Sequence, residues 1–121
     1  MKKILVVEDD TFLNKVFVNK LSGSGFEVIS LSDGLKALET ASREMPDLIL
    51  LDLMLPGKNG FDILTDFKKD EKLKNIPVII MSNLGQEEET QRGLSMGAVE
   101  YFVKTDIKLD EMVERINEYL K

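Results

Sequence analysis

The side chains in this sequence that could do chemistry carry oxygen or an amine, because its 121 residues include no cysteine and no histidine. Their absence excludes disulfides, thiolate chemistry, Cys-based zinc sites and Ser-His or Cys-His pairs. The remaining candidates stand directly after short apolar runs of the chain. They are Glu8, Asp9, Asp10, Asp52, Ser82, Asn83 and Lys104.

These side chains favour phosphoryl chemistry at a metal site if they lie together. Four carboxylates gathered at one place repel one another, so they call for a cation. Oxygen donors suit Mg²⁺, which keeps several waters and binds one or two carboxylates together with phosphate. The Asp52 carboxylate could attack phosphorus, and the Ser82 hydroxyl and Lys104 ammonium could bind phosphoryl oxygens.

Each of these residues alone also has a simpler interpretation. An acidic run before a helix is often an N-cap, here with Asp10 or Thr11 as the capping residue. Asp52 could begin a turn, Ser82 could cap a helix, and Lys104 could be a solvated side chain. Their occurrence at the same end of successive apolar runs favours the site over these separate explanations.

The apolar runs that must position these residues predict buried strands. Near-continuous runs are typical of parallel strands that are covered on both faces, although the second and fifth runs here are weaker. The runs are Ile4–Val7, Phe26–Ile29, Leu48–Leu51, Val78–Met81 and Val99–Val103.

Apolar residues at helical spacing lie between the runs. The last stripe is the clearest, whereas the polar segment Gly85–Gly97 predicts a loosely held helix. The stripes contain Leu13, Val16, Phe17 and Leu21; Leu35, Leu38 and Ala41; Leu64 and Phe67; and Leu109, Met112, Val113, Ile116 and Leu120. Five strand–helix alternations predict an α/β fold, a doubly wound five-stranded parallel sheet with five helices on both faces.

The composition limits the other classes of function. The length suits one domain, and 43% hydrophobic and 31% charged residues are ordinary for a globular protein. A net charge of −6 argues against nucleic-acid binding. We find no apolar run of membrane-spanning length and no signal peptide, so exclusion predicts a cytoplasmic protein without membrane contact.

At these residues the chain resembles the receiver domain of two-component response regulators over essentially its whole length. The resemblance implies that residues 1–121 form one receiver domain. Ile4–Asp10 is similar to the family's acidic motif after the first strand, and Asp52–Gly60 to its phosphoacceptor motif. Ser82, Tyr101 and Lys104 stand at the hydroxyl, aromatic and lysine positions of the family. The resemblance implies a flavodoxin-like sheet with the strand order 2-1-3-4-5.

The resemblance also implies the chemistry. Asp52 would take a phosphoryl group from a phosphohistidine on a sensor histidine kinase or a phosphotransfer protein. Asp9, Asp52 and the backbone carbonyl of Met54 would bind Mg²⁺, and Glu8 would assist through water. Such a domain is a switch and not an enzyme.

The family's switch residues are implied in the same way. Ser82 and Lys104 would receive the phosphoryl oxygens, and movement of Ser82 would let Tyr101 turn inward. That motion would reshape the face made by the fourth helix, fifth strand and fifth helix. The face would signal to a downstream protein or a fused output domain.

A phosphorylation-dependent dimer is left open by the sequence. Glu100, Lys108 and Asp110 could support one, but no pattern among them decides the matter.

Three features depart from the family pattern. Lys104 is followed by Thr105 where the family usually has proline after a cis bond, and a cis bond before another residue costs about 2.5–4 kcal/mol. The residue after Ser82 is Asn83, not a small residue, which could narrow access to the phosphate. Met54 and Leu84 are apolar at positions that influence the hydrolytic water, so we expect slow self-dephosphorylation.

Three other functions fit the pattern less well. A haloacid-dehalogenase-like phosphohydrolase would need a second aspartate where this chain has Met54. A flavodoxin-like carrier would need a hydroxyl- and glycine-rich phosphate loop after the first strand, where this chain has acidic residues. A degenerate receiver that only docks to partners remains open because of Asn83 and Thr105.

Overall fold

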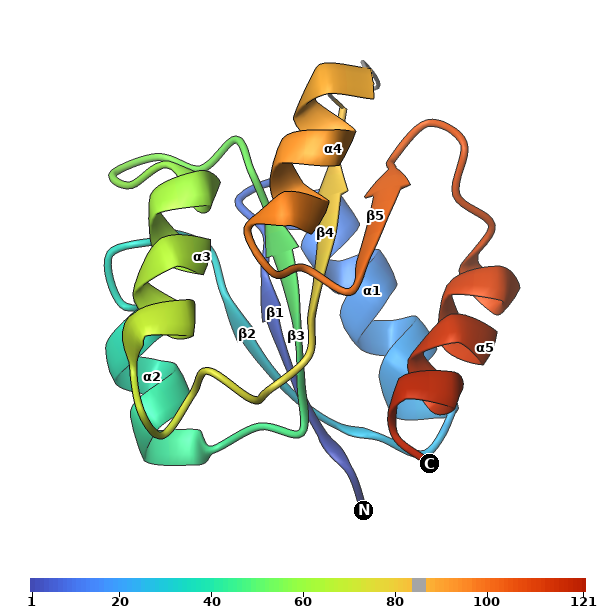
Figure 1. Cartoon of the computed structure of the whole chain (residues 1–121). Coiled ribbons are helices and arrows are strands. Elements are labelled where there is room, and N and C mark those ends of the chain that lie inside the picture. The colour runs from blue at the N-terminus through green and yellow to red at the C-terminus, as the bar shows by residue number, and fades with distance from the viewer. Residues whose placement is uncertain (84–86) are drawn as a thin grey trace.

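The computed structural model describes residues 1–83 and 87–121, and its centre is a five-stranded parallel sheet (Figure 1). The strand order is β2-β1-β3-β4-β5, as the resemblance predicts. The strands are β1 (Lys3–Val7), β2 (Glu27–Leu31), β3 (Leu48–Asp52), β4 (Val78–Ser82) and β5 (Glu100–Val103).

Helices cover both faces of the sheet, and each face has its own core. Alternate residues of a strand point to opposite faces. Ile4 and Val6 therefore pack with one core and Leu5 and Val7 with the other, and all four are fully buried. The helices are α1 (Thr11–Gly23) and α5 (Leu109–Tyr119) on the first face, and α2 (Ala37–Glu44), α3 (Gly60–Lys69) and α4 (Glu87–Ser95) on the second.

Local signals in the sequence fix where two helices begin near the site. The Asp10 side chain accepts a hydrogen bond of 3.0 Å from the Leu13 amide and caps α1, as one of the simpler interpretations predicts. Asn59 caps α3 in the same way, through a bond of 2.7 Å from the Phe61 amide. The first cap lies in the acidic segment after β1, and the second ends the loop that follows Asp52.

The second helical stripe was partly wrong. Leu35 does not belong to α2; it precedes the helix and is 68% exposed. Its side chain instead lies against Gly57 of the loop after β3, where an added Cβ would be 2.9 Å from the Leu35 Cγ. α2 is therefore shorter than the stripe suggests, and it buries Ala37, Thr40 and Ala41.

α4 has few buried residues, in agreement with its polar sequence. Gly93 is its one buried residue. A Cβ there would lie 2.6 Å from Ile80 Cδ1 and 3.3 Å from the Tyr101 ring, so the helix backbone approaches the sheet closely. The Arg92 guanidinium lies 4.0 Å from the centre of the Phe61 ring and ties α4 to α3.

The sheet gathers the candidate residues at one edge, the carboxyl ends of the strands. Ligands bind at this edge in open α/β sheets. Asp52 and Ser82 end β3 and β4, while Glu8 and Lys104 directly follow β1 and β5.

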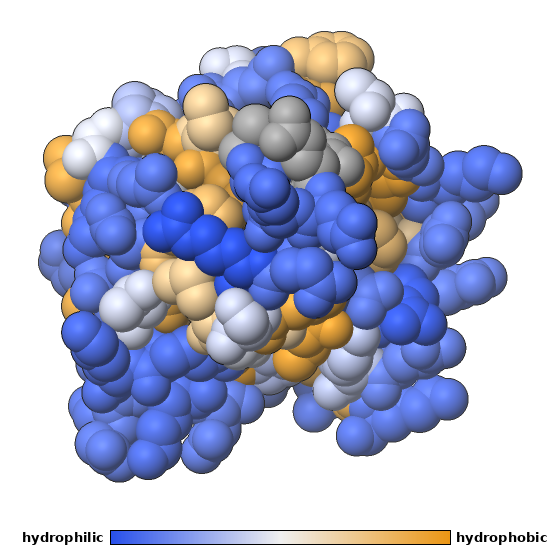
Figure 2. Space-filling model, turned by 45° about the horizontal axis from the view of Figure 1, so that its top comes forward, coloured by the Kyte–Doolittle hydropathy of each residue, from blue (hydrophilic) through white to orange (hydrophobic). Residues whose placement is uncertain are grey.

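Within the described part of the chain, no helix has the length and apolar character needed to cross a membrane. Figure 2 shows a mostly hydrophilic surface with small hydrophobic areas.

Candidate functional site

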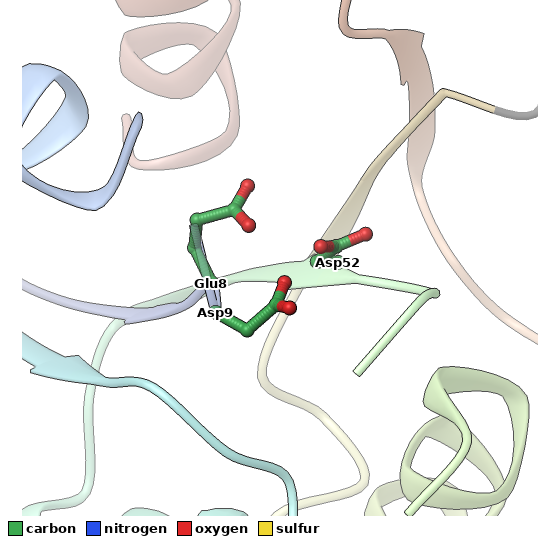
Figure 3. Close-up of side chains that lie close together, drawn as sticks. All are labelled: Glu8, Asp9 and Asp52. Atoms are coloured by element: carbon green, nitrogen blue, oxygen red, sulfur yellow. The ribbon is translucent and has the colours of Figure 1, made fainter. Parts of the chain in front are cut away.

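Three carboxylates converge beyond the ends of β1 and β3. Glu8, Asp9 and Asp52 each offer an oxygen, and these oxygens all lie within 4.8 Å of one another. Figure 3 shows the three side chains around a common space. Glu8 and Asp52 are buried, whereas Asp9 is exposed. The exposed Asp9 thus gives the cluster a side that is open to a ligand.

Asp52 is held in one orientation by two hydrogen bonds. Its Oδ1 accepts a bond of 3.1 Å from the Met54 amide, and its Oδ2 accepts one of 2.9 Å from Lys104 Nζ. The residue is 2% exposed. Buried charges in proteins need such partners, because an isolated carboxylate would be strongly destabilising there.

Lys104 carries the positive charge of the site. Its Nζ forms ion pairs with both Glu8 and Asp52, and its side chain is 7% exposed. Burial lowers the pKa of this ammonium, but the bonds and charges of the two carboxylates outweigh that effect and raise it overall. Among the described residues no peptide bond is cis, so the Lys104–Thr105 bond is trans.

Glu8 is fully buried between the start of α1 and Lys104. Its Oε2 accepts a bond of 3.1 Å from the Asp10 amide. Burial raises the pKa of the Glu8 carboxyl from 4.5 to about 7, although hydrogen bonds with Lys104 and the Asp10 amide act in the opposite direction and the Asp52 charge adds to the rise. Two buried carboxylates share the Lys104 cation, so its charge only partly offsets the effect of burial on the pKa of Glu8.

Replacing Glu8 by glutamine should change how the stability of the metal-free protein depends on pH. A carboxyl whose pKa is raised on folding stabilises the fold below its unfolded-state value of 4.5, and this contribution is lost as the pH rises through about 7. From about pH 5 to pH 8, the wild type should lose free energy of unfolding relative to Glu8→Gln, by on the order of 2 kcal/mol. Urea unfolding in the presence of a chelator measures the difference.

The exposed Glu39→Gln substitution on α2 is the control, and it should track the wild type at every pH. A difference between the wild type and Glu8→Gln that stays constant with pH would contradict the assignment.

Ser82 and Tyr101 lie on neighbouring strands beside this cluster. Ser82 is fully buried, one position beyond Met81, which pairs with Asp52 across β3 and β4. Burial raises the pKa of the Tyr101 phenol, and a hydrogen bond with Ser82 opposes the rise. The hydroxyl and aromatic residues predicted to form the switch are therefore in contact with each other.

The loop after Asp52 depends on two glycines. Gly57 has a φ of +83°, a conformation that glycine adopts without strain. Gly60 lies directly against the chain that carries Asp52, and its amide donates a bond of 3.0 Å to the Leu53 carbonyl. Met54 is 60% exposed in this loop, so its side chain forms no part of the core.

Asn83 was expected to narrow access to the phosphate, and Leu84 to influence the hydrolytic water. Asn83 is exposed. Leu84 lies outside the described residues.

The donor set fits Mg²⁺. Carboxylate oxygens from three residues surround one point, and a single lysine only partly balances their charge. A small divalent cation bound through few protein oxygens and several waters suits such a half-open cluster.

Two contributions to the site were not predicted from the sequence. Asn14 Nδ2 donates to the Glu8 carbonyl at 3.0 Å and to the Leu31 carbonyl at 3.3 Å, and so joins the ends of β1 and β2. A polar residue on a helix gives no sign of such backbone partners. The direct ion pair between Lys104 and Glu8 depends on side-chain directions that spacing alone does not give.

Comparisons with known proteins agree with this geometry. The family model described as response regulator receiver domain matches residues 4–117. The polar-differentiation response regulator DivK of Brucella ovis is 34% identical over 119 residues, which cover 98% of this chain and 96% of DivK. The DNA-binding dual master transcriptional regulator RpaA of Synechocystis is 34% identical over 121 residues, but the chain spans only 50% of its length.

Solved structures of receiver domains superimpose closely on this chain. The receiver domain of the Francisella response regulator 1452 superimposes with a TM-score of 0.92 at 30% identity, covering 99% of this chain and 97% of that one. The BeF3-activated N-terminal receiver domain of Klebsiella pneumoniae RstA also has a TM-score of 0.92 at 30% identity, with 99% of both chains covered.

Proposed function

The chain belongs to the response regulator receiver family of two-component signalling, whose members generally accept a phosphoryl group, and we propose that Asp52 is its acceptor. In this proposal residues 1–121 form one receiver domain. The phosphoryl group comes from a phosphohistidine of a sensor histidine kinase or a phosphotransfer protein.

The observation that supports the proposal most strongly is the environment of the Asp52 carboxylate. It is buried but lies beside the exposed Asp9, with Lys104 bound to its Oδ2 at 2.9 Å. A nucleophile held in this way is protected from competing water yet can be reached from one side. The nearby Lys104 and Ser82 are suited to bind the oxygens of a transferred phosphoryl group.

The metal site of the proposal consists of Asp9, Asp52 and the Met54 carbonyl, with Glu8 acting through water. Mg²⁺ bound there would neutralise charge on the phosphoryl oxygens. Lys104 orients the acceptor through its bond to Oδ2, Glu8 holds Lys104 from the other side, and the Met54 amide fixes Oδ1 of Asp52.

Replacing Asp9 by asparagine should greatly slow Mg²⁺-dependent phosphoryl uptake, because it removes the exposed carboxylate of the cluster. Uptake from a small phosphoryl donor, measured by intact mass with and without Mg²⁺, gives the result. We expect a loss of about a hundredfold or more in rate, because even the groups that only orient metal ligands contribute about 10- to 100-fold.

The neighbouring Asp10→Asn substitution is the matched control. Asp10 caps α1, and asparagine caps equally well, so this variant should keep both its stability and its phosphoryl uptake. Equal rates in the two variants would contradict the proposed metal site.

We further propose that the phosphorylated form loses its phosphoryl group slowly. The exposed Met54 side chain next to Asp52 has no group that could orient a water by hydrogen bonding. The phosphorylated protein, freed of donor, should therefore persist for minutes or longer when its mass is followed. Decay within seconds would show that another group activates the water.

The output of the proposed switch is the face of α4, β5 and α5. Tyr101 links this face to Ser82, and α4 is held there by few buried residues. Such a weakly held element can change position at a cost of a few kcal/mol. A downstream protein or a fused output domain would bind this face, and a phosphorylation-dependent dimer is its other use.

A further inference from the structure

The outer edge of the sheet carries a groove that is lined by both apolar and acidic side chains and that the fold leaves partly uncovered. β5 pairs only with β4 within the described sheet, and all four of its residues are half-buried. The apolar part of its lining, called the floor here, consists of Tyr101, Phe102, Val103 and Ile107. Phe102 and Ile107 pack against the core under α5, and Tyr101 against the core under α4. The groove therefore lies where the two layers of helices meet.

Acidic side chains border this groove. Asp106 and Glu111 line it, and both are exposed. Neither takes part in an ion pair with any residue that the structure describes. Their charges are thus available to a partner.

Arg115, the arginine of α5, does not neutralise the acidic side chains that border the groove. Arg115 is already bound to Glu100, at 3.1 and 3.2 Å, and to Glu118 at 3.1 Å. Residues 87–121 contain nine acidic and five basic side chains, so they hold −4 of the chain's net charge of −6. The charge surplus is concentrated in the elements that surround the groove.

We infer that the groove along β5 binds a basic amphipathic segment of a partner protein, with its apolar side chains on the floor and its lysines or arginines beside Asp106 and Glu111. This inference rests on the proposed function, because it names the chemistry of the partner that the α4–β5–α5 face would bind. Charge complementarity favours this occupant, since like charges across an interface are strongly disfavoured. Figure 2 shows hydrophobic areas bordered by hydrophilic residues on the side of the molecule where α4 lies.

The test uses helix-forming probe peptides and the full chain at moderate salt. A leucine–lysine peptide should bind, whereas a leucine–glutamate peptide and a serine–lysine peptide of equal length should not. Amide chemical shifts in an NMR titration should change first at residues 101–111. Changes spread over the whole acidic surface, or binding of the serine–lysine peptide with equal strength, would overturn the inference.

Paired variants separate the groove from general charge attraction. The double substitution Asp106→Asn and Glu111→Gln should weaken binding about fivefold. The control pair Glu39→Gln and Asp62→Asn, on α2 and α3, changes the net charge equally and should weaken it less than about twofold. Equal losses in both pairs would contradict the inference.

The same variants distinguish this inference from the proposed function. Phosphoryl uptake at Asp52 should persist in Asp106→Asn/Glu111→Gln, since neither residue contacts the acceptor. Uptake without peptide binding would overturn the docking inference alone. Peptide binding to a protein that takes up no phosphoryl group would overturn the proposed function and leave the groove as a docking site.

Discussion

Replacing Lys104 by methionine is expected to lower the free energy of unfolding of the metal-free protein by about 3 kcal/mol at about pH 8. The substitution leaves Glu8 and Asp52 buried side by side without the cation that each of them contacts. Removing one partner of a buried ion pair is strongly destabilising because the other charge stays buried. The pH matters because Glu8, whose pKa burial raises to about 7, would take up a proton at lower pH and so relieve the repulsion. Denaturant unfolding in a chelator measures the loss.

Mg²⁺ should restore much of that stability, because it supplies positive charge to the same oxygens. The exposed Lys108→Met substitution, four residues further on, is the control and should stay within about 0.5 kcal/mol of the wild type. An unchanged unfolding midpoint in Lys104→Met would show that the carboxylates are compensated in some other way.

Gly60→Ala should be destabilising by about 3 kcal/mol and should also slow phosphoryl uptake. A Cβ on Gly60 would lie 2.5 Å from the Leu53 Cα and 2.6 Å from the Asp52 carbonyl oxygen. These are backbone atoms, so no side-chain rotation can remove the clash, and the chain that carries the acceptor must move. Both the unfolding midpoint and the rate of uptake should report the shift.

Gly23→Ala at the end of α1 is the matched control. Apart from its chain neighbours and the backbone of its own helix, nothing lies within 4 Å of a Cβ built there, so this variant should keep its stability or gain up to about 1 kcal/mol. Its phosphoryl uptake should equal that of the wild type. If Gly60→Ala behaves like this control, the loop after Asp52 tolerates displacement and the close approach is not required.

The sequence predicted the sheet well because the strand signal and the helix signal alternate clearly. The run Leu48–Leu51 is fully buried in the structure, and β3 extends only one residue beyond it, to Asp52. Leu35 was misassigned to a helix because its spacing from Leu38 is helical. Tertiary contact with Gly57 overrides that local pattern and leaves Leu35 in the loop before α2.

The site could be predicted only in part. Parallel strands bring their carboxyl ends to one edge, so the gathering of Glu8, Asp52, Ser82 and Lys104 follows from the chain order. Which oxygen of Asp52 meets which donor does not follow, because it depends on rotamers set by the whole site. The raised pKa of Glu8 likewise requires knowledge of its burial, which a residue next to the exposed Asp9 does not reveal.

Intact mass after incubation with a small phosphoryl donor tests the central claim most directly. The wild type should gain one phosphoryl group in the presence of Mg²⁺ and none in a chelator, while Asp52→Asn should gain none in either condition. A gain in Asp52→Asn equal to that of the wild type would contradict the assignment of Asp52. No gain in the folded wild type, together with no Mg²⁺ binding, would identify the chain as a receiver that only docks to partners.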